Sequence, residues 1–145
     1  MAHVRDLLAI KGRQVFSVGP DATVLDAALL MNEHRIGSLV VMDGGDVVGI
    51  ITERDILQRV VVHRRDPATT GLRDVMTTEV VCCEPGTPIE EARSVLKHRR
   101  IRHLPVCGDA DGLVGLISIG DLNAYHADDR ERTIHVLQEY IHGRV

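Results

Sequence analysis

Aromatic residues are almost missing from this chain of 145 residues, which has no tryptophan, one phenylalanine and two tyrosines. A protein that stacks unpaired bases needs several aromatic faces, so this composition argues against a platform for single-stranded nucleic acid. Aliphatic side chains must fill the core instead, and hydrophobic residues make up 44% of the sequence. The net charge of −4 offers no overall attraction to a nucleic-acid backbone. We therefore expect a compact globular protein with an aliphatic core.

Cysteines and long apolar runs are also scarce. The three cysteines are odd in number, and Cys82 and Cys83 are adjacent, which would place them on opposite faces of a strand. Because neighbours on a strand are poorly placed to bridge each other, we expect free thiols in a reducing cytoplasm. No apolar run approaches the length of a membrane span, and charges interrupt the first ten residues. We therefore expect neither a membrane segment nor a secretory signal.

The chain repeats itself, because four segments occur twice in the same order. They are VRDLL and LRDVM, PDATVLDA and PGTPIEEA, RIGSLVV and RIRHLPV, and VGIITERD and VGLISIGD. The second copy has one extra residue before its last segment, in the turn GDADG. Neither copy is long enough to bury its own apolar face, so we expect the two to pack as one pseudo-twofold structure.

Each copy predicts the same order of elements: a short amphipathic helix, a brief strand, a longer helix, a hairpin and a final helix. In the second copy Thr87 should cap the longer helix, with Pro88 at its first position. Gly44 and Gly45 predict the turn of the first hairpin. The final helices should begin near Thr52 and Ser118. The brief strands are residues 14–18 and 79–83, and the apolar helix stripes are Val24, Ala27, Ala28 and Met31, and Ile89, Ala92 and Leu96.

The repeats resemble the CBS domain, the module named after cystathionine β-synthase, of which two in tandem form a Bateman pair. Both copies carry the motif glycine, two aliphatic residues, serine or threonine, two variable residues and aspartate. The sequence motifs are similar to those of standalone bacterial CBS-pair proteins at residues 34–41, 52–55, 100–106, 118–121 and 137–141. The resemblance implies an α/β (α+β) fold of two CBS repeats with pseudo-twofold symmetry, each a small sheet packed by helices. Their expected bounds are 1–65 and 66–127, followed by a C-terminal helix at 128–145.

The resemblance also implies ligands, because CBS pairs hold adenosine compounds in a cleft between the repeats. AMP, ADP, ATP and NAD(H) are the expected ligands, and S-adenosylmethionine is bound by some members. In the family the aspartate holds ribose hydroxyls, and the adenine wall comes from the opposite repeat. One implied site combines Ser118, Ile119, Gly120 and Asp121 with Phe16, Ile36, Gly37, Arg102 and His103. The other combines Thr52, Glu53, Arg54 and Asp55 with Val81 and Ile101.

The residue types support this chemistry without the resemblance. A carboxylate accepts two hydrogen bonds from a vicinal diol, and Asp55 and Asp121 each stand three residues after a hydroxyl residue. This spacing places both groups at a helix start, where free N–H groups and the helix dipole favour a phosphate. Arg102 and His103 add cations that suit a phosphate. The competing interpretation is that both motifs are only helix-capping boxes, which need no ligand.

Three alternative functions remain open at this point. The basic segment KHRRIRH, residues 97–103, would carry nucleic-acid binding, although no aromatic residue is interleaved. Cys82, Cys83 and Cys107 would need a histidine to bind a metal, and no C-x-x-C spacing is present. Ser118 with Asp121 and a histidine would form the nucleophile of a nucleotide hydrolase, but the serine lacks the Gly-x-Ser-x-Gly context.

We expect a non-catalytic regulatory protein that senses adenine nucleotides and requires no metal. Ligand in the cleft would stabilise one conformation, and a separate effector protein would respond to it. A homodimer is expected, with the amphipathic opening helices and the stripe of Ile134, Leu137 and Ile141 as candidate dimer surfaces. A cytoplasmic location follows from the expected free thiols and the absence of a membrane segment.

Overall fold

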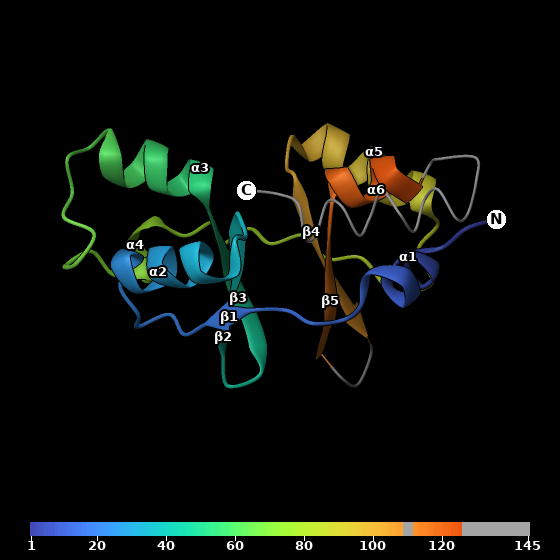
Figure 1. Ribbon diagram of the computed structural model, residues 1–145, viewed down its shortest axis with the longest axis horizontal. Helices are drawn as coiled ribbons and strands as arrows, with labels where there is room; N and C mark the ends of the chain where they lie inside the picture. Colours follow the sequence, from blue (N-terminus) through green and yellow to red (C-terminus); the bar gives the residue numbers. More distant parts are fainter. Residues whose placement is uncertain (109–111, 126–145) are drawn as a thin grey trace. The chain divides into compact units, whose positions relative to one another are not determined.

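The computed structural model describes residues 1–108 and 112–125, so the second hairpin turn and the predicted C-terminal helix lie outside the described residues (Figure 1). The chain forms two compact units. The first-repeat unit consists of residues 15–80, and the second-repeat unit consists of residues 1–14 together with the chain from Val81 onward. The predicted boundary between residues 65 and 66 separates the two sequence repeats, whereas the compact units divide the chain at other positions.

The first-repeat unit contains one three-stranded sheet with the strand order β1-β2-β3. Strand β1 runs parallel to β2, and β2 pairs antiparallel with β3 across the turn at Gly44 and Gly45, as the sequence predicts. The strands are β1 (Ser17–Val18), β2 (Ser38–Asp43) and β3 (Asp46–Thr52). The helices are α2 (Val24–His34), α3 (Glu53–Ile56), its π-helical continuation η1 (Leu57–Val61), and α4 (Leu72–Val75).

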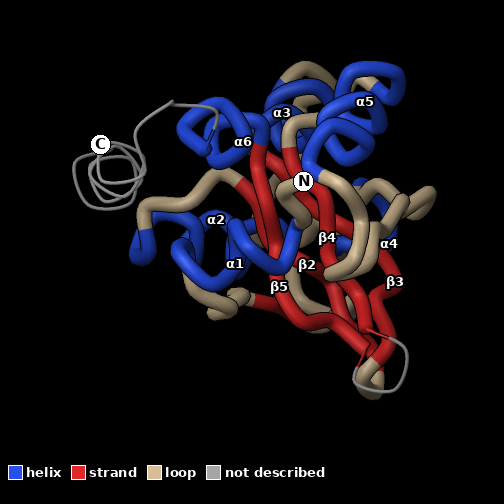
Figure 2. The backbone as a smooth tube through the Cα atoms, turned by 90° about the vertical axis from the view of Figure 1, so that its right-hand side faces the viewer, coloured by secondary structure: helices blue, strands red, loops and turns tan. Residues whose placement is uncertain are grey.

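The second-repeat unit contains a two-stranded antiparallel sheet. Its elements are α1 (Val4–Lys11), α5 (Ile89–Arg99), β4 (His103–Gly108), β5 (Gly112–Ser118) and α6 (Ile119–Tyr125). The hairpin register shifts between Val106 and Cys107, and the first hairpin shifts at the matching place, between Val41 and Met42. The two repeats therefore share local irregularities as well as sequence motifs. Figure 2 shows helix α6 continuing directly from the end of strand β5.

Aliphatic residues fill both cores, as the composition predicts. The predicted stripes of α2 and α5 are buried, except that Ala28 of α2 is only half-buried. The first core consists of Val24, Ala27, Met31, Leu39, Val41, Ile51, Val60, Leu72 and Val75. The second core consists of Val4, Leu7, Leu8, Cys83, Ile89, Ala92, Leu96, Leu104, Val106, Ile117, Leu122 and Ala124.

Each opening helix packs in the unit of the other repeat. In α1 the side chains of Leu7 and Leu8 are 0% and 1% exposed, and both belong to the core of the second-repeat unit. The Val4 N–H donates to the Thr87 carbonyl, and α4 is tied in the same way by the Leu72 N–H, which donates to the Ala22 carbonyl. The apolar faces of the opening helices are thus buried within their units, and a part for these helices in a dimer surface stays a prediction.

A glycine in the second strand of each hairpin, Gly49 in β3 and Gly115 in β5, permits this packing. A Cβ atom on Gly115 would lie 2.7 Å from Leu8 Cδ2, and one on Gly49 would lie 2.7 Å from Met76 Sδ. Any larger residue would therefore displace the opening helix or the segment that follows it. The glycine of the repeated motif is thus explained by close packing.

The local predictions for the two brief strands and for the start of α5 differ from the structure. The strand predicted at residues 14–18 is present only as Ser17–Val18. The segment 79–83 forms no strand, and its pairing is an isolated bridge between Cys83 and Val106. Thr87 does not cap α5, since Pro88 is the N-cap residue and the Thr87 hydroxyl accepts a hydrogen bond from the Glu84 N–H. The hydroxyl closes the turn before the helix, which leaves no local side chain for the cap.

Candidate functional site

Among the residues that the structure describes, three Ser/Thr-x-x-Asp boxes begin helices. In each of them the hydroxyl oxygen accepts from the aspartate N–H at 3.1 Å, and the carboxylate accepts from the N–H of the hydroxyl residue at 2.8 to 3.0 Å. The boxes are Thr23–Asp26 at α2, Thr52–Asp55 at α3 and Ser118–Asp121 at α6. The capping interpretation is therefore confirmed as local geometry for all three.

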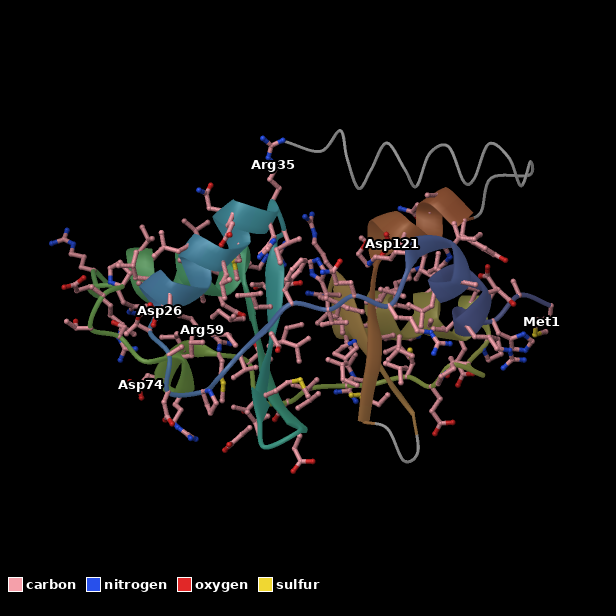
Figure 3. All side chains as sticks on the ribbon, turned by 60° about the horizontal axis from the view of Figure 1, so that its bottom comes forward. Met1, Asp26, Arg35, Arg59, Asp74 and Asp121 are labelled. Carbon is pink, nitrogen blue, oxygen red and sulfur yellow. The ribbon has the colours of Figure 1, made fainter. Side chains whose placement is uncertain are left out.

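Burial separates the two repeated motifs from the ordinary cap. Asp26 is exposed, whereas Asp55 is 8% exposed and Asp121 is 0% exposed. Figure 3 shows Asp26 and Asp121 on different helices. A cap needs no burial, and removing a carboxylate from water costs free energy unless other groups compensate. Asp55 and Asp121 therefore have surroundings that capping alone does not explain.

Asp121 is held by a cation from the far end of the sequence. Lys11, at the end of α1, donates from Nζ to Asp121 Oδ2 at 2.5 Å and to the Leu116 carbonyl at 2.7 Å. The Ser118 N–H donates to the same Oδ2 atom. Asp121 Oδ1 is buried and has no hydrogen-bond partner among the described residues. One carboxylate oxygen is thus fully engaged, while the other retains its capacity to accept.

Asp55 is held mainly by a hydroxyl group. Thr77 follows α4 and donates from Oγ1 to Asp55 at 3.3 Å for Oδ1 and 3.4 Å for Oδ2. Arg59, one helical turn after Asp55, places Nε 3.9 Å from Oδ1. Its Nη1 atom donates to the carbonyls of Val75 and Met76, so this cation is fixed against the end of α4. The two carboxylates therefore differ in the charge of their closest long-range partner.

The predicted site residues, including the two aspartates, fall into two groups, one in each unit. Phe16, Ile36, Gly37, Thr52, Glu53, Arg54 and Asp55 lie in the first-repeat unit, and Val81, Ile101, Arg102, His103, Ser118, Ile119, Gly120 and Asp121 lie in the second-repeat unit. Phe16 and Ile36 pack against the first core, and Val81 and Ile101 pack against the second. All four hydrophobic residues implied for the site thus pack against the core of their own unit. The combination of residues across the two repeats remains a prediction.

The segments 35–41 and 100–106, which both begin with Arg-Ile, lie beside the start of the final helix in their own repeats. The Glu53 N–H donates to the Gly37 carbonyl at 3.0 Å, and the Ile119 N–H donates to the Arg102 carbonyl at 2.9 Å. Arg54 and Arg102 are exposed at the two helix starts, and His103 is half-buried. One face of the Phe16 ring is covered by His34, with ring centroids 3.8 Å apart. An exposed arginine therefore stands near the start of the final helix in each repeat.

Sequence analysis missed three partners of the aspartates. Lys11 is 110 residues from Asp121 and Thr77 is 22 residues from Asp55, so no local pattern links either pair. Arg59 stands at the i+4 position from Asp55, a spacing that predicts an ion pair on a helix. Only Arg59 therefore left a local signal in the sequence.

The cysteines are free thiols in the structure, as predicted. Burial, followed by the nearby Cys107, raises the pKa of the Cys83 thiol to about 12, so it remains protonated at neutral pH. No group of three or more histidine, cysteine, aspartate or glutamate residues within the described chain is arranged to hold a metal ion. Among the same residues, none of the helices is both long and apolar enough to cross a membrane.

Comparison with protein families places both repeats in one family. The CBS domain profile matches residues 4–62 and 72–128. The CBS domain-containing protein YhcV of Bacillus subtilis is 36% identical over 122 residues, which cover 84% of each chain. The mitochondrial CBS domain-containing protein CBSX3 of Arabidopsis thaliana is 37% identical over 128 residues, covering 85% of this chain and 62% of CBSX3. The chain belongs to the CBS-domain family and is a tandem pair of CBS domains.

Solved structures agree with this assignment. A protein with CBS domains from Burkholderia ambifaria superimposes with a TM-score of 0.84 at 39% identity, covering 89% of this chain and 96% of that one. The CBS domain pair of protein MJ0100, in complex with 5′-methylthioadenosine and S-adenosyl-L-methionine, gives a TM-score of 0.76 at 22% identity, covering 86% and 95%. The second likeness establishes the fold alone. The predicted fold of two tandem CBS repeats is confirmed.

Proposed function

We propose that this CBS pair is a non-catalytic regulatory module that binds adenine nucleotides. The ligands are AMP, ADP, ATP or NAD(H), held by the two aspartate motifs together with aliphatic walls for the purine. Ligand binding stabilises one conformation of the pair, and a separate effector protein responds to it. This assignment covers the described repeats and requires no metal.

The observation that carries the proposal is the burial of the two repeated aspartates. Each lies at a helix start where backbone N–H groups favour an anion, and each has a hydroxyl residue three positions earlier. Asp121 also retains a buried oxygen without a hydrogen-bond partner among the described residues. A ribose hydroxyl would donate to such an oxygen and remove the cost of leaving it unpaired. The exposed arginines at the helix starts would then pair with phosphate.

The comparisons support the ligand class at the level of the family. The CBS pair of MJ0100 is described in complex with two adenosine-containing compounds. At 22% identity that protein supplies the fold, so the support for ligand-binding residues comes from this chain's own aspartates. Adenine nucleotides share the adenosine portion of those compounds, which is the part that a carboxylate and an aliphatic wall would hold.

Isothermal titration calorimetry with AMP, ATP and NADH tests the proposal. Each aspartate contributes a charge-assisted hydrogen bond, so Asp55→Asn or Asp121→Asn should weaken binding about ten- to a hundred-fold. Asp26→Asn is the matched control, because it removes the same capping carboxylate from an exposed box and should leave binding unchanged. No binding by the wild type, or equal loss in all three variants, would contradict the proposal.

We also propose that the chain forms a homodimer through exposed apolar side chains on the helices of the first-repeat unit. Leu25 and Leu29 are 39% and 59% exposed on α2, and Leu57 and Val61 are 57% and 59% exposed on α3–η1. Leu25 and Leu29 have the i, i+4 spacing that aligns side chains along one face of an α-helix, and Leu57 and Val61 are the first and last residues of η1. A CBS-CP12 protein from bloom-forming cyanobacteria, 29% identical, is hexameric. Light scattering should give a dimer for the wild type and a monomer for Leu29→Glu combined with Leu57→Glu; a monomeric wild type would refute the dimer.

A further inference from the structure

Lys11 and Thr77 make corresponding contacts in the two units, although they are not aligned positions of the two repeats. In the first-repeat unit, the Thr77 backbone N–H donates to the Ile50 carbonyl and its hydroxyl donates to Asp55. In the second-repeat unit, Lys11 Nζ donates to the Leu116 carbonyl and to Asp121. Ile50 and Leu116 are both the residue after the motif glycine. Each aspartate therefore receives a donor from the opening segment of the other repeat, but one donor is neutral and the other is a cation.

The two donors differ in mobility as well as in charge. Thr77 is held by two backbone hydrogen bonds to Ile50, so its hydroxyl is fixed beside Asp55. Lys11 reaches Asp121 through a flexible four-carbon stem, and its side chain is 22% exposed. Asp121 itself is 0% exposed, so the solvent-facing member of this pair is the lysine. A ligand hydroxyl that approaches Asp121 meets Lys11 first.

We propose that Lys11 is a specificity-determining residue of the Ser118–Asp121 site, which makes this site select ligands that carry a phosphate. This inference rests on the proposed nucleotide-binding function. When both hydroxyls of a ribose diol bind Asp121, one donates to the unpartnered Oδ1 and the other displaces the Lys11 ammonium from Oδ2. The stem allows the displaced ammonium to pair with the phosphate of the same ligand. A nucleoside has no phosphate, so it breaks the ion pair without giving the Lys11 ammonium a new anionic partner. It therefore binds more weakly.

The Asp55 site has no such exchange. Thr77 is uncharged, and Arg59 is held in place by two backbone carbonyls. A ribose hydroxyl can therefore bind Asp55 without releasing a cation from it. The two motifs, which are nearly equal in sequence, are thus expected to differ in their discrimination between nucleoside and nucleotide.

The test compares AMP with adenosine in a background that isolates one site. Asp55→Ala removes the other carboxylate, and calorimetry then gives the ratio of the adenosine Kd to the AMP Kd at the Ser118–Asp121 site. We expect AMP to bind at least about tenfold more tightly than adenosine, as one charge-assisted bond to phosphate implies. Adding Lys11→Met should lower this ratio at least about tenfold, because adenosine no longer competes with an ammonium and AMP loses its cation.

Control variants separate charge from structure. Lys11→Arg keeps a cation and should retain the preference for AMP, whereas Lys97→Met removes an exposed lysine of α5 and should change nothing. Circular dichroism establishes folding first, since Lys11→Met leaves a buried carboxylate without its cation. If that variant does not fold, Lys11→Gln carries the same expectation, because its amide can still donate to Asp121.

The outcomes distinguish this inference from the proposed function. An unchanged Kd ratio in Lys11→Met or Lys11→Gln overturns the inference and leaves nucleotide binding intact. If Asp55→Ala binds neither ligand while the wild type binds AMP, the Ser118–Asp121 site takes no nucleotide, and the inference fails while the function survives at Asp55. If the wild type binds neither ligand, the proposed function itself is refuted, and the inference fails with it.

Discussion

Each opening helix packs in the unit of the other repeat, and we call this arrangement the exchange of opening helices. It allows a quantitative prediction about Leu7. Leu7 belongs to the first repeat in the sequence, but its side chain is 0% exposed and packs in the core of the second-repeat unit. Replacing a buried leucine by alanine costs about 2–5 kcal/mol, so Leu7→Ala should remove a large share of the stability of this unit. That loss corresponds to a roughly 30-fold to several-thousand-fold increase in the population of open states.

Hydrogen exchange measured by mass spectrometry locates this loss. Leu7→Ala should increase amide exchange chiefly in β4 and β5, residues 103–108 and 112–118, although these strands follow Leu7 by about a hundred residues. Leu72→Ala is the matched control, because Leu72 is also 0% exposed but belongs to the other core, and it should act chiefly on β2 and β3. If Leu7→Ala instead loosened β2 and β3 more than β4 and β5, the exchange of opening helices would be refuted.

Three further predictions concern stability, measured by urea denaturation. Gly115→Ala should destabilise by about 1–3 kcal/mol, because its Cβ would lie 2.7 Å from Leu8; no loss would refute this contact. Arg35→Gly should stabilise by about 1 kcal/mol, because Arg35 ends α2 with φ 55°, and a destabilised variant would contradict this. Burial raises the pKa of Cys83 from 9.0 to about 12, so the unfolded state loses its proton first and stability should fall as pH rises from 9 towards 12. Cys83→Ala should show a smaller fall, and an equal fall in both proteins would refute the assignment.

Local signals in the sequence predicted the elements that local chemistry determines. The glycine pair predicted the first hairpin turn, and the hydroxyl residues Thr52 and Ser118 predicted where the final helices begin. The paired Asp55 and Asp121 motifs identified the two buried carboxylates because duplication distinguished them from ordinary caps. The Thr23–Asp26 box has the same geometry and lies exposed, so a single motif would not have been informative.

Long-range pairing could not be predicted from the sequence. The core positions of Leu7 and Leu72 depend on packing against the other repeat, which the order of the repeats along the chain does not reveal. The strand expected at residues 79–83 lacks a continuous partner, so β-propensity alone failed there. Lys11 and Thr77 escaped notice for the same reason, since their contacts with the aspartates span 110 and 22 residues.

A crystal structure with bound AMP measures the central claim most directly. We expect the ribose hydroxyls to lie within hydrogen-bonding distance of the carboxylate of Asp55 or Asp121, with the phosphate at the start of the following helix. If AMP at saturating concentration bound elsewhere on the protein and contacted neither aspartate, these buried acids would be shown only to cap helices.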